Sequence, residues 1–177
     1  MSKDFLKLAD YIASDLAYGS MWHTAMANEF RKIACRGLAR FSEIEALGDF
    51  KSNQCFQKLL IDRCNYTPQI EFKIPSVQWS SYKDLPQILQ KWEAWETEFA
   101  GTLTQAVELA RSIDIDIYRF LIDLTAEVQN EVFRVKSLHN NFENSGYDWH
   151  HISRANIIIH DYYEKHGDCQ KADFNIG

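Results

Sequence analysis

The sequence predicts an all-α fold: a four-helix bundle with one long crossover and a short fifth helix. Apolar residues recur at steps of three and four over four long stretches, which places them on one face of a helix. The 177 residues include only 7 glycines and 3 prolines, so there is little material for the many turns of a strand-rich fold. Pro68 and Pro75 both fall between the second and third helical patterns, where we expect the crossover.

The sequence also indicates where the helices begin and end. The patterns place the four long helices at residues 3–34, 38–63, 85–112 and 117–142. Ser2 is the expected N-cap of the first helix and Asp84 that of the third, because short polar side chains accept hydrogen bonds from free backbone N–H groups. Gly37 ends the Cys-Arg-Gly run that separates the first two helices, since glycine suits a C-terminal turn.

The crossover is expected at residues 65–84 and contains a β-like run at 70–74. A connection of that length can carry the chain from one end of a bundle to the other. An Asn-Ser-Gly turn at 144–146 then precedes a short amphipathic helix at 148–165. One long crossover is typical of the ferritin-like variant of the four-helix bundle.

Composition indicates one globular domain over residues 1–166, followed by a flexible tail at 167–177. The chain is 46% hydrophobic and has a net charge of -6 without a basic run, so we expect no nucleic-acid partner. It shows neither a membrane-spanning apolar run nor a signal peptide, which favours the cytoplasm. Its cysteines lack CxxC spacing and are expected to be free thiols: Cys35, Cys55, Cys64 and Cys169.

Polar residues interrupt the middle of all four apolar stripes. If the helices form a bundle, these residues point inward at a similar depth: His23, Glu45, Asp49, Glu96, Glu127 and Glu131. Buried carboxyl groups are costly unless they are paired, hydrogen-bonded or bound to metal. Two interpretations remain open: a site for a hard cation such as iron, or a polar layer that is neutralised by His23, Arg or Lys, or by protonation.

The chain resembles the bacterial non-haem ferritins over about residues 3–166. The stretches that carry the resemblance are 15–26 (DLAYGSMWHTAM), 37–41 (GLARF), 90–96 (QKWEAWE) and 124–127 (LTAE). The resemblance implies an iron-storage subunit in a hollow homo-oligomeric cage of roughly 24 chains. It also implies a ferroxidase centre built from a Glu on the first helix, Glu-x-x-His on the second, a Glu on the third and polar ligands on the fourth.

This chain departs from that ligand pattern. Leu16 stands at the first-helix Glu position, and the second-helix motif reads Asp49-x-x-Ser52. Val128 stands where the fourth helix commonly has a polar ligand. The residues expected to hold metal are Glu96, Glu127, Glu131, Asp49 and His23. We therefore expect one bound iron rather than a tight pair, and weak or absent ferroxidase activity, so whether the chain is an enzyme stays open.

The fifth helix and the methionines point to no further site. The histidines of the fifth helix do not share one face, which favours surface or interface positions: His150, His151, His160 and His166. No haem is expected, because the internal methionines are Met21 and Met26 and no inward interface methionine stands out. The alternative function is a non-catalytic shell, co-assembly or interaction protein without bound iron.

Overall fold

A computed structural model describes residues 2–77 and 81–167. The elements in these residues are α1 (Lys3–Lys32), α2 (Arg36–Cys64), a 3₁₀ turn η1 (Tyr82–Asp84), α3 (Leu85–Ala110), α4 (Ile115–Asn144) and α5 (Trp149–His166). The predicted all-α class and the order of four long helices and one short helix are confirmed. Most of the tail expected at 167–177, and Cys169 with it, lies outside the described residues.

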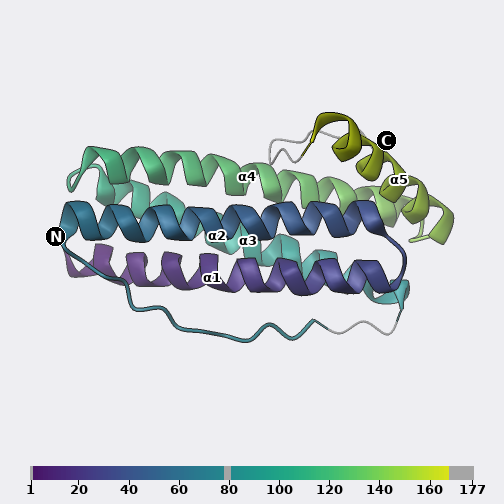
Figure 1. Ribbon diagram of the computed structural model, residues 1–177, viewed down its shortest axis with the longest axis horizontal. Helices are drawn as coiled ribbons and strands as arrows, with labels where there is room; N and C mark the ends of the chain where they lie inside the picture. Colours follow the sequence, from purple (N-terminus) through teal and green to yellow (C-terminus); the bar gives the residue numbers. More distant parts are fainter. Residues whose placement is uncertain (1, 78–80, 168–177) are drawn as a thin grey trace.

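The four long helices form two antiparallel pairs, α1 with α2 and α3 with α4, while α5 packs against α2 at one end (Figure 1). The crossover runs the length of the bundle, as expected, but residues 70–74 form no strand. Side chains of α1 hold it in place. Asp10 Oδ1 accepts hydrogen bonds from Gln69 N at 2.8 Å and Tyr66 Oη at 2.6 Å, and Ser14 Oγ accepts one from Glu71 N at 2.9 Å. These contacts explain an extended chain without a partner strand.

Helix capping agrees with the sequence at one position and differs at another. Ser2 caps α1 as predicted, because its Oγ accepts a hydrogen bond from Phe5 N at 3.2 Å. Asp84 stands at the start of α3 but makes no side-chain cap there. Its Oδ2 instead accepts from Ser81 N at 3.1 Å and completes the capping box of η1. The Asp84 side chain therefore caps the 3₁₀ turn η1 and not α3, for which the sequence predicted it.

The connection between α1 and α2 also corrects a prediction. Ala34, not Gly37, takes the left-handed conformation, with φ of 61°, and Gly37 lies inside α2. A Cβ atom on Gly37 would collide with Asn156 O and would lie 2.7 Å from His160 N of α5. Asn156 Oδ1 accepts from Gly37 N at 2.7 Å and from Leu38 N at 3.2 Å. Glycine here allows α5 to approach and to cap α2.

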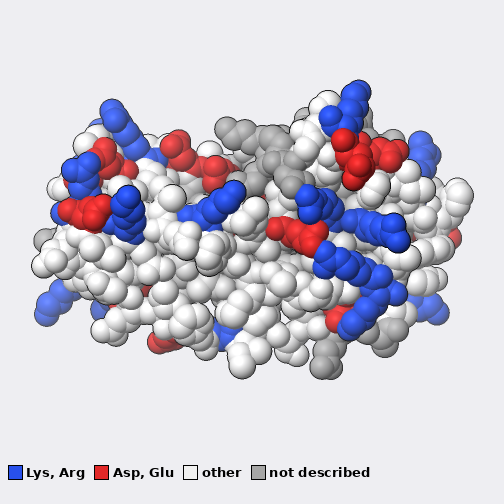
Figure 2. Space-filling view, viewed as in Figure 1, with Lys and Arg blue, Asp and Glu red and all other residues white. Residues whose placement is uncertain are grey.

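The interior consists of two apolar clusters with a polar layer between them. The cluster near α5 includes Trp22, Phe30, Phe41, Trp92 and Phe142. The other includes Phe5, Leu16, Phe56, Phe99 and Leu121. Figure 2 shows acidic and basic side chains mixed over one face of the bundle, with Lys and Arg most concentrated toward the α5 end. Among the described residues, no helix has the length and hydropathy needed to cross a membrane.

Candidate metal centre

His23 lies at the middle of the polar layer and is fully buried. Its Nε2 atom is 3.3 Å from Glu131 Oε1, 3.5 Å from Glu96 Oε1 and 3.6 Å from Asp49 Oδ2. His23 lies on α1, Asp49 on α2, Glu96 on α3 and Glu131 on α4, so each long helix contributes one group. Four of the five residues that the sequence singled out as ligands are thus brought together.

Several polar atoms of this centre have no hydrogen-bond partner. Among the described residues, they include both ring nitrogens of His23 and the Oδ2 atom of Asp49. An unsatisfied buried polar group costs about 1–3 kcal/mol. Ligand atoms of His23, Glu96 and Glu131 lie within 4.8 Å of one another. Convergent lone pairs, some of them without a donor, are an arrangement that a cation would satisfy.

The electrostatics of the centre favour added positive charge. Burial raises the pKa of Asp49 and of Glu96, and the neighbouring Glu131 carboxylate raises both further. Burial also lowers the pKa of His23, partly opposed by Glu131. His23 is therefore neutral near pH 7 and retains a ring lone pair for a metal.

Three tryptophans surround the imidazole of His23. The ring centroids of Trp92, Trp22 and Trp95 lie 4.9, 5.3 and 5.6 Å from that of His23. Trp92 Nε1 also donates a hydrogen bond of 3.0 Å to Glu131 Oε1, which orients that carboxylate. The aromatic wall fixes the His23 ring, and its indoles offer no lone-pair ligand, so the carboxylates and His23 form the donor set.

On α1, Leu16 and Gly19 have different surroundings. Leu16, which the resemblance placed at a ligand position, is buried in the apolar cluster with Phe56 and Phe99. Gly19 lies beside the centre instead, and a Cβ atom there would collide with Asp49 Oδ2 and approach Trp95 to 2.8 Å. Helix α1 therefore contributes His23 to the centre, and at Gly19 it has no side chain and so no carboxylate.

Glu127 lies apart from the buried group. It is exposed, although it lines a small cavity of about 20 Å³ between α2 and α4. The other residues around this cavity include Glu45, Asp49, Ser52, Val128, Glu131 and Arg134. This volume is about that of one water molecule. Glu127 is thus placed to meet an ion at the edge of the centre, not inside it.

Glu45, which could have faced either way from sequence alone, is buried and paired. Its Oε1 atom accepts a hydrogen bond from Arg134 Nη2 at 2.6 Å, and the two side chains are 5% and 10% exposed. Burial and then Glu131 raise the pKa of Glu45, while Arg134 lowers it. One carboxyl group of the layer therefore has a protein cation of its own.

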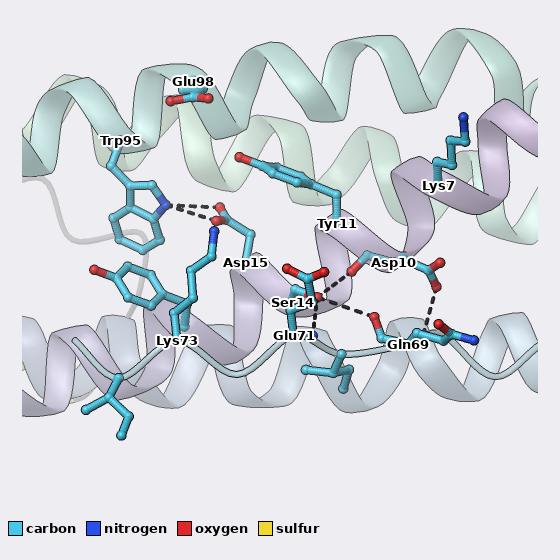
Figure 3. Close-up of a pocket in the computed structure, with 13 residues that line it drawn as sticks. Lys7, Asp10, Tyr11, Ser14, Asp15, Gln69, Glu71, Lys73, Trp95 and Glu98 are labelled. Atoms are coloured by element: carbon cyan, nitrogen blue, oxygen red, sulfur yellow. Dashed lines mark hydrogen bonds between the residues drawn. The ribbon is translucent and has the colours of Figure 1, made fainter.

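A larger cavity of about 890 Å³ lies between α1, α3 and the crossover (Figure 3). Asp15 forms part of its wall and receives hydrogen bonds of 3.1 Å from Trp95 Nε1 at both carboxylate oxygens. Lys73 extends toward Asp15 from the crossover. Burial raises the pKa of Asp15 to about 6. Since Gly19 follows Asp15 by one helical turn, this cavity ends close to the buried centre.

The histidines of α5 are distant from this chemistry. His150, His151 and His166 are exposed, and His160 is half-buried. His151 Nδ1 lies 3.4 Å from Asp148 Oδ2 at the helix start. Within residues 2–77 and 81–167, the group of His, Cys, Asp and Glu that could hold a metal is His23, Glu96 and Glu131.

A four-helix bundle with one long crossover and a short fifth helix is a ferritin-like fold. The chain is similar to the open-pore ferritin of the archaeon Archaeoglobus fulgidus, with a TM-score of 0.77 and 15% identity over 90% of this chain and 96% of that one. An engineered closed form of the same ferritin gives a TM-score of 0.72 and 15% identity over 99% of both chains. The structure of a PmFTN variant soaked in iron gives a TM-score of 0.74 and 15% identity over 89% of this chain and 99% of that one.

At these identities the likeness shows the fold alone, and that fold is ferritin-like. The resemblance inferred from the sequence is confirmed at this level. No protein-family model matches the chain, and no curated protein sequence matches it. Metal binding by this chain must therefore be argued from its own residues.

Sequence reasoning did not single out Gly19, Arg134 and Asp15, and it assigned Trp92 to packing. Gly19 carried a signal, because a glycine inside a helix costs up to about 1 kcal/mol relative to alanine and calls for a packing reason. Arg134 also carried one, since it follows Glu131 by three residues and so lies beside it on α4. The hydrogen bonds of Trp92 and Asp15 depend on contacts between helices, which spacing along one helix does not reveal.

Proposed function

We propose that this chain is a ferritin-like iron-storage subunit that binds iron at His23, Asp49, Glu96 and Glu131. One observation carries the proposal: donor atoms from four helices converge at the middle of the bundle, and two of those atoms, His23 Nε2 and Asp49 Oδ2, have no hydrogen-bond partner among the described residues. Carboxylate oxygens and an imidazole suit iron and other divalent cations. Iron is the cargo of such a subunit, delivered to the centre and then stored.

The ferroxidase step is proposed to be weak or absent. Two irons bridged for oxygen chemistry need a carboxylate or imidazole ligand on α1 and another on α2. Here α1 has Leu16 at the position that the resemblance gives to Glu, and α2 has Ser52 three residues after Asp49. Asp49 is also one methylene shorter than glutamate. One ion held by His23 and the carboxylates fits this donor set better than a bridged pair.

The proposed assembly is a closed homo-oligomeric cage. Large apolar side chains are exposed on the crossover and on the outer faces of the helices, including Phe72, Ile74, Phe50 and Phe133. Exposed apolar groups of this size are often buried between subunits. Closed point-group symmetry is the usual way to do this with identical chains.

A second candidate function is a non-catalytic shell or interaction subunit without iron. The observation that favours it is the Glu45–Arg134 pair, which already neutralises part of the polar layer. In that case protonation of Asp49 and Glu96 would satisfy the rest, in keeping with their raised pKa values.

Anaerobic titration with Fe²⁺, followed by elemental analysis after gel filtration, distinguishes these functions. The metal-storage proposal predicts about one tightly held ion per chain and its loss in Glu96→Gln and Glu131→Gln. Glu108→Gln is the matched control, because Glu108 is an exposed residue of the same helix as Glu96. If the unmodified protein retains no iron, the shell function is favoured; if all three variants retain it equally, iron binds elsewhere and the proposed site is wrong.

A further inference from the structure

The Arg134 side chain lies at the edge of the buried centre and is held rigidly. Its guanidinium donates to Glu45 at 2.6 Å, and its Cζ atom lies 5.6 Å from the centre of the Phe41 ring. The side chain is only 10% exposed. Because arginine does not lose its proton in proteins, this position carries a permanent positive charge.

The same guanidinium borders the small cavity beside the centre. That cavity of about 20 Å³ is lined by four carboxylate side chains, Glu45, Asp49, Glu127 and Glu131, together with Arg134. Without the arginine, this would be a set of oxygen ligands for a hard divalent cation. With it, a cation that enters the cavity meets a fixed like charge at short range, where the low dielectric strengthens repulsion.

The position of Arg134 among these carboxylates leads to the same conclusion. Its guanidinium already pairs with Glu45, so that carboxylate is not free to serve a metal ion. A second divalent ion in the cavity would be repelled both by Arg134 and by an ion held at His23, Glu96 and Glu131.

We infer that Arg134 is a built-in cation that replaces a second metal ion and limits the centre to one divalent ion. This inference rests on the proposed metal site and adds to it the residue that sets how many ions bind. Arg134 is a specificity-determining residue: it touches Glu45 and the cavity, and no role in electron or proton transfer is assigned to it.

Mn²⁺ binding to the full-length protein tests this inference, because Mn²⁺ is paramagnetic and is not readily oxidised near neutral pH. The readouts are the number of ions per chain after gel filtration and the electron paramagnetic resonance spectrum. The unmodified protein should hold one isolated Mn²⁺. Arg134→Gln should hold about two, with the signal of a magnetically coupled pair.

Two further variants serve as controls. Arg134→Lys keeps the positive charge and should stay at one ion, while Arg119→Gln removes an exposed arginine of the same helix and should also stay at one. If circular dichroism shows that Arg134→Gln is unfolded, the double variant Glu45→Gln/Arg134→Gln replaces it. Removing both partners of a buried pair avoids an uncompensated charge, and this variant should also bind more than one ion.

The outcomes separate the two proposals. One Mn²⁺ in the unmodified protein and still one in folded Arg134→Gln overturns the role of Arg134 but leaves the metal site intact. Two ions in the unmodified protein overturn it as well. No bound Mn²⁺ in the unmodified protein, with none gained on removing Arg134, refutes the metal site itself.

Discussion

His23 Nε2 lies 3.3 Å from Glu131 Oε1, and this contact joins α1 to α4 at the level where the two apolar clusters meet. Neither side chain is at the surface. The distance is longer than a good N–H···O hydrogen bond, whose usual value is about 2.9 Å. A neutral imidazole and a carboxylate held at this separation leave their lone pairs available to a shared ion.

The first prediction concerns protons released when metal binds. Burial and Glu131 raise the pKa of Asp49 and Glu96, so these groups keep their protons to a higher pH than free carboxyl groups in the metal-free protein. Metal ligands must be deprotonated, so binding should release protons and the affinity should fall as the pH falls below neutral. Calorimetric titration with Mn²⁺ in buffers of different ionisation enthalpy measures the number of protons released. Binding with no proton release would contradict these protonation states.

The second prediction concerns Asp15 and stability. Its folded pKa of about 6 lies above the ordinary aspartate pKa of 3.8, so the folded state binds the proton more tightly than the unfolded state. The free energy of unfolding should therefore fall as the pH rises from about 4 to above 6, by roughly 3 kcal/mol at most. Asp15→Asn should remove that fall. Urea unfolding of both proteins across this range gives the difference curve, and parallel curves would show that Asp15 is not perturbed.

The third prediction contrasts two helical glycines. Gly19→Ala should destabilise the protein by about 1–3 kcal/mol and weaken metal binding, because the added Cβ would collide with Asp49 and press on Trp95. Gly101→Ala is the matched control on α3, where nothing lies within 4 Å of an added Cβ. It should stabilise the protein by about 0.5–1 kcal/mol. Thermal unfolding and Mn²⁺ titration of both variants check this, and similar effects in the two would refute the close packing at Gly19.

The fourth prediction concerns Leu16 of α1. Leu16→Glu should not create a metal ligand, because Leu16 is 1% exposed and packs in the apolar cluster with Phe56 and Phe99. It should instead destabilise the protein by about 3 kcal/mol or more through burial of a carboxyl group without a partner. Chemical unfolding and the rate of Fe²⁺ oxidation are the measurements. A stable Leu16→Glu protein with faster oxidation would place Leu16 at the centre after all.

The fold could be predicted from sequence because it depends on local signals. Stripes of three- and four-residue spacing, a scarcity of glycine and proline, and a single Pro-containing gap were enough to place all five helices within a few residues. The errors at Gly37 and Asp84 share one cause. Glycine and aspartate both suit a helix end. The contact with α5 determines the role of Gly37, and the hydrogen bond from Ser81 determines the role of Asp84.

The candidate site could be predicted only in part. Helical spacing placed His23, Asp49, Glu96 and Glu131 on inward faces, which the structure brings together. Spacing does not determine how the helices are rotated and shifted against one another. The relative position of the helices leaves Glu127 exposed and brings Gly19 against Asp49. It also brings Glu45 and Arg134 together.

The central claim is that one metal ion binds among His23, Asp49, Glu96 and Glu131, and anomalous diffraction tests it most directly. Crystals soaked anaerobically in Fe²⁺ and measured at the iron absorption edge should show one buried peak per chain. That peak should lie roughly 2–2.5 Å from His23 Nε2 and from the carboxylate oxygens. No peak in the polar layer, or peaks only at surface carboxylates, would contradict the account.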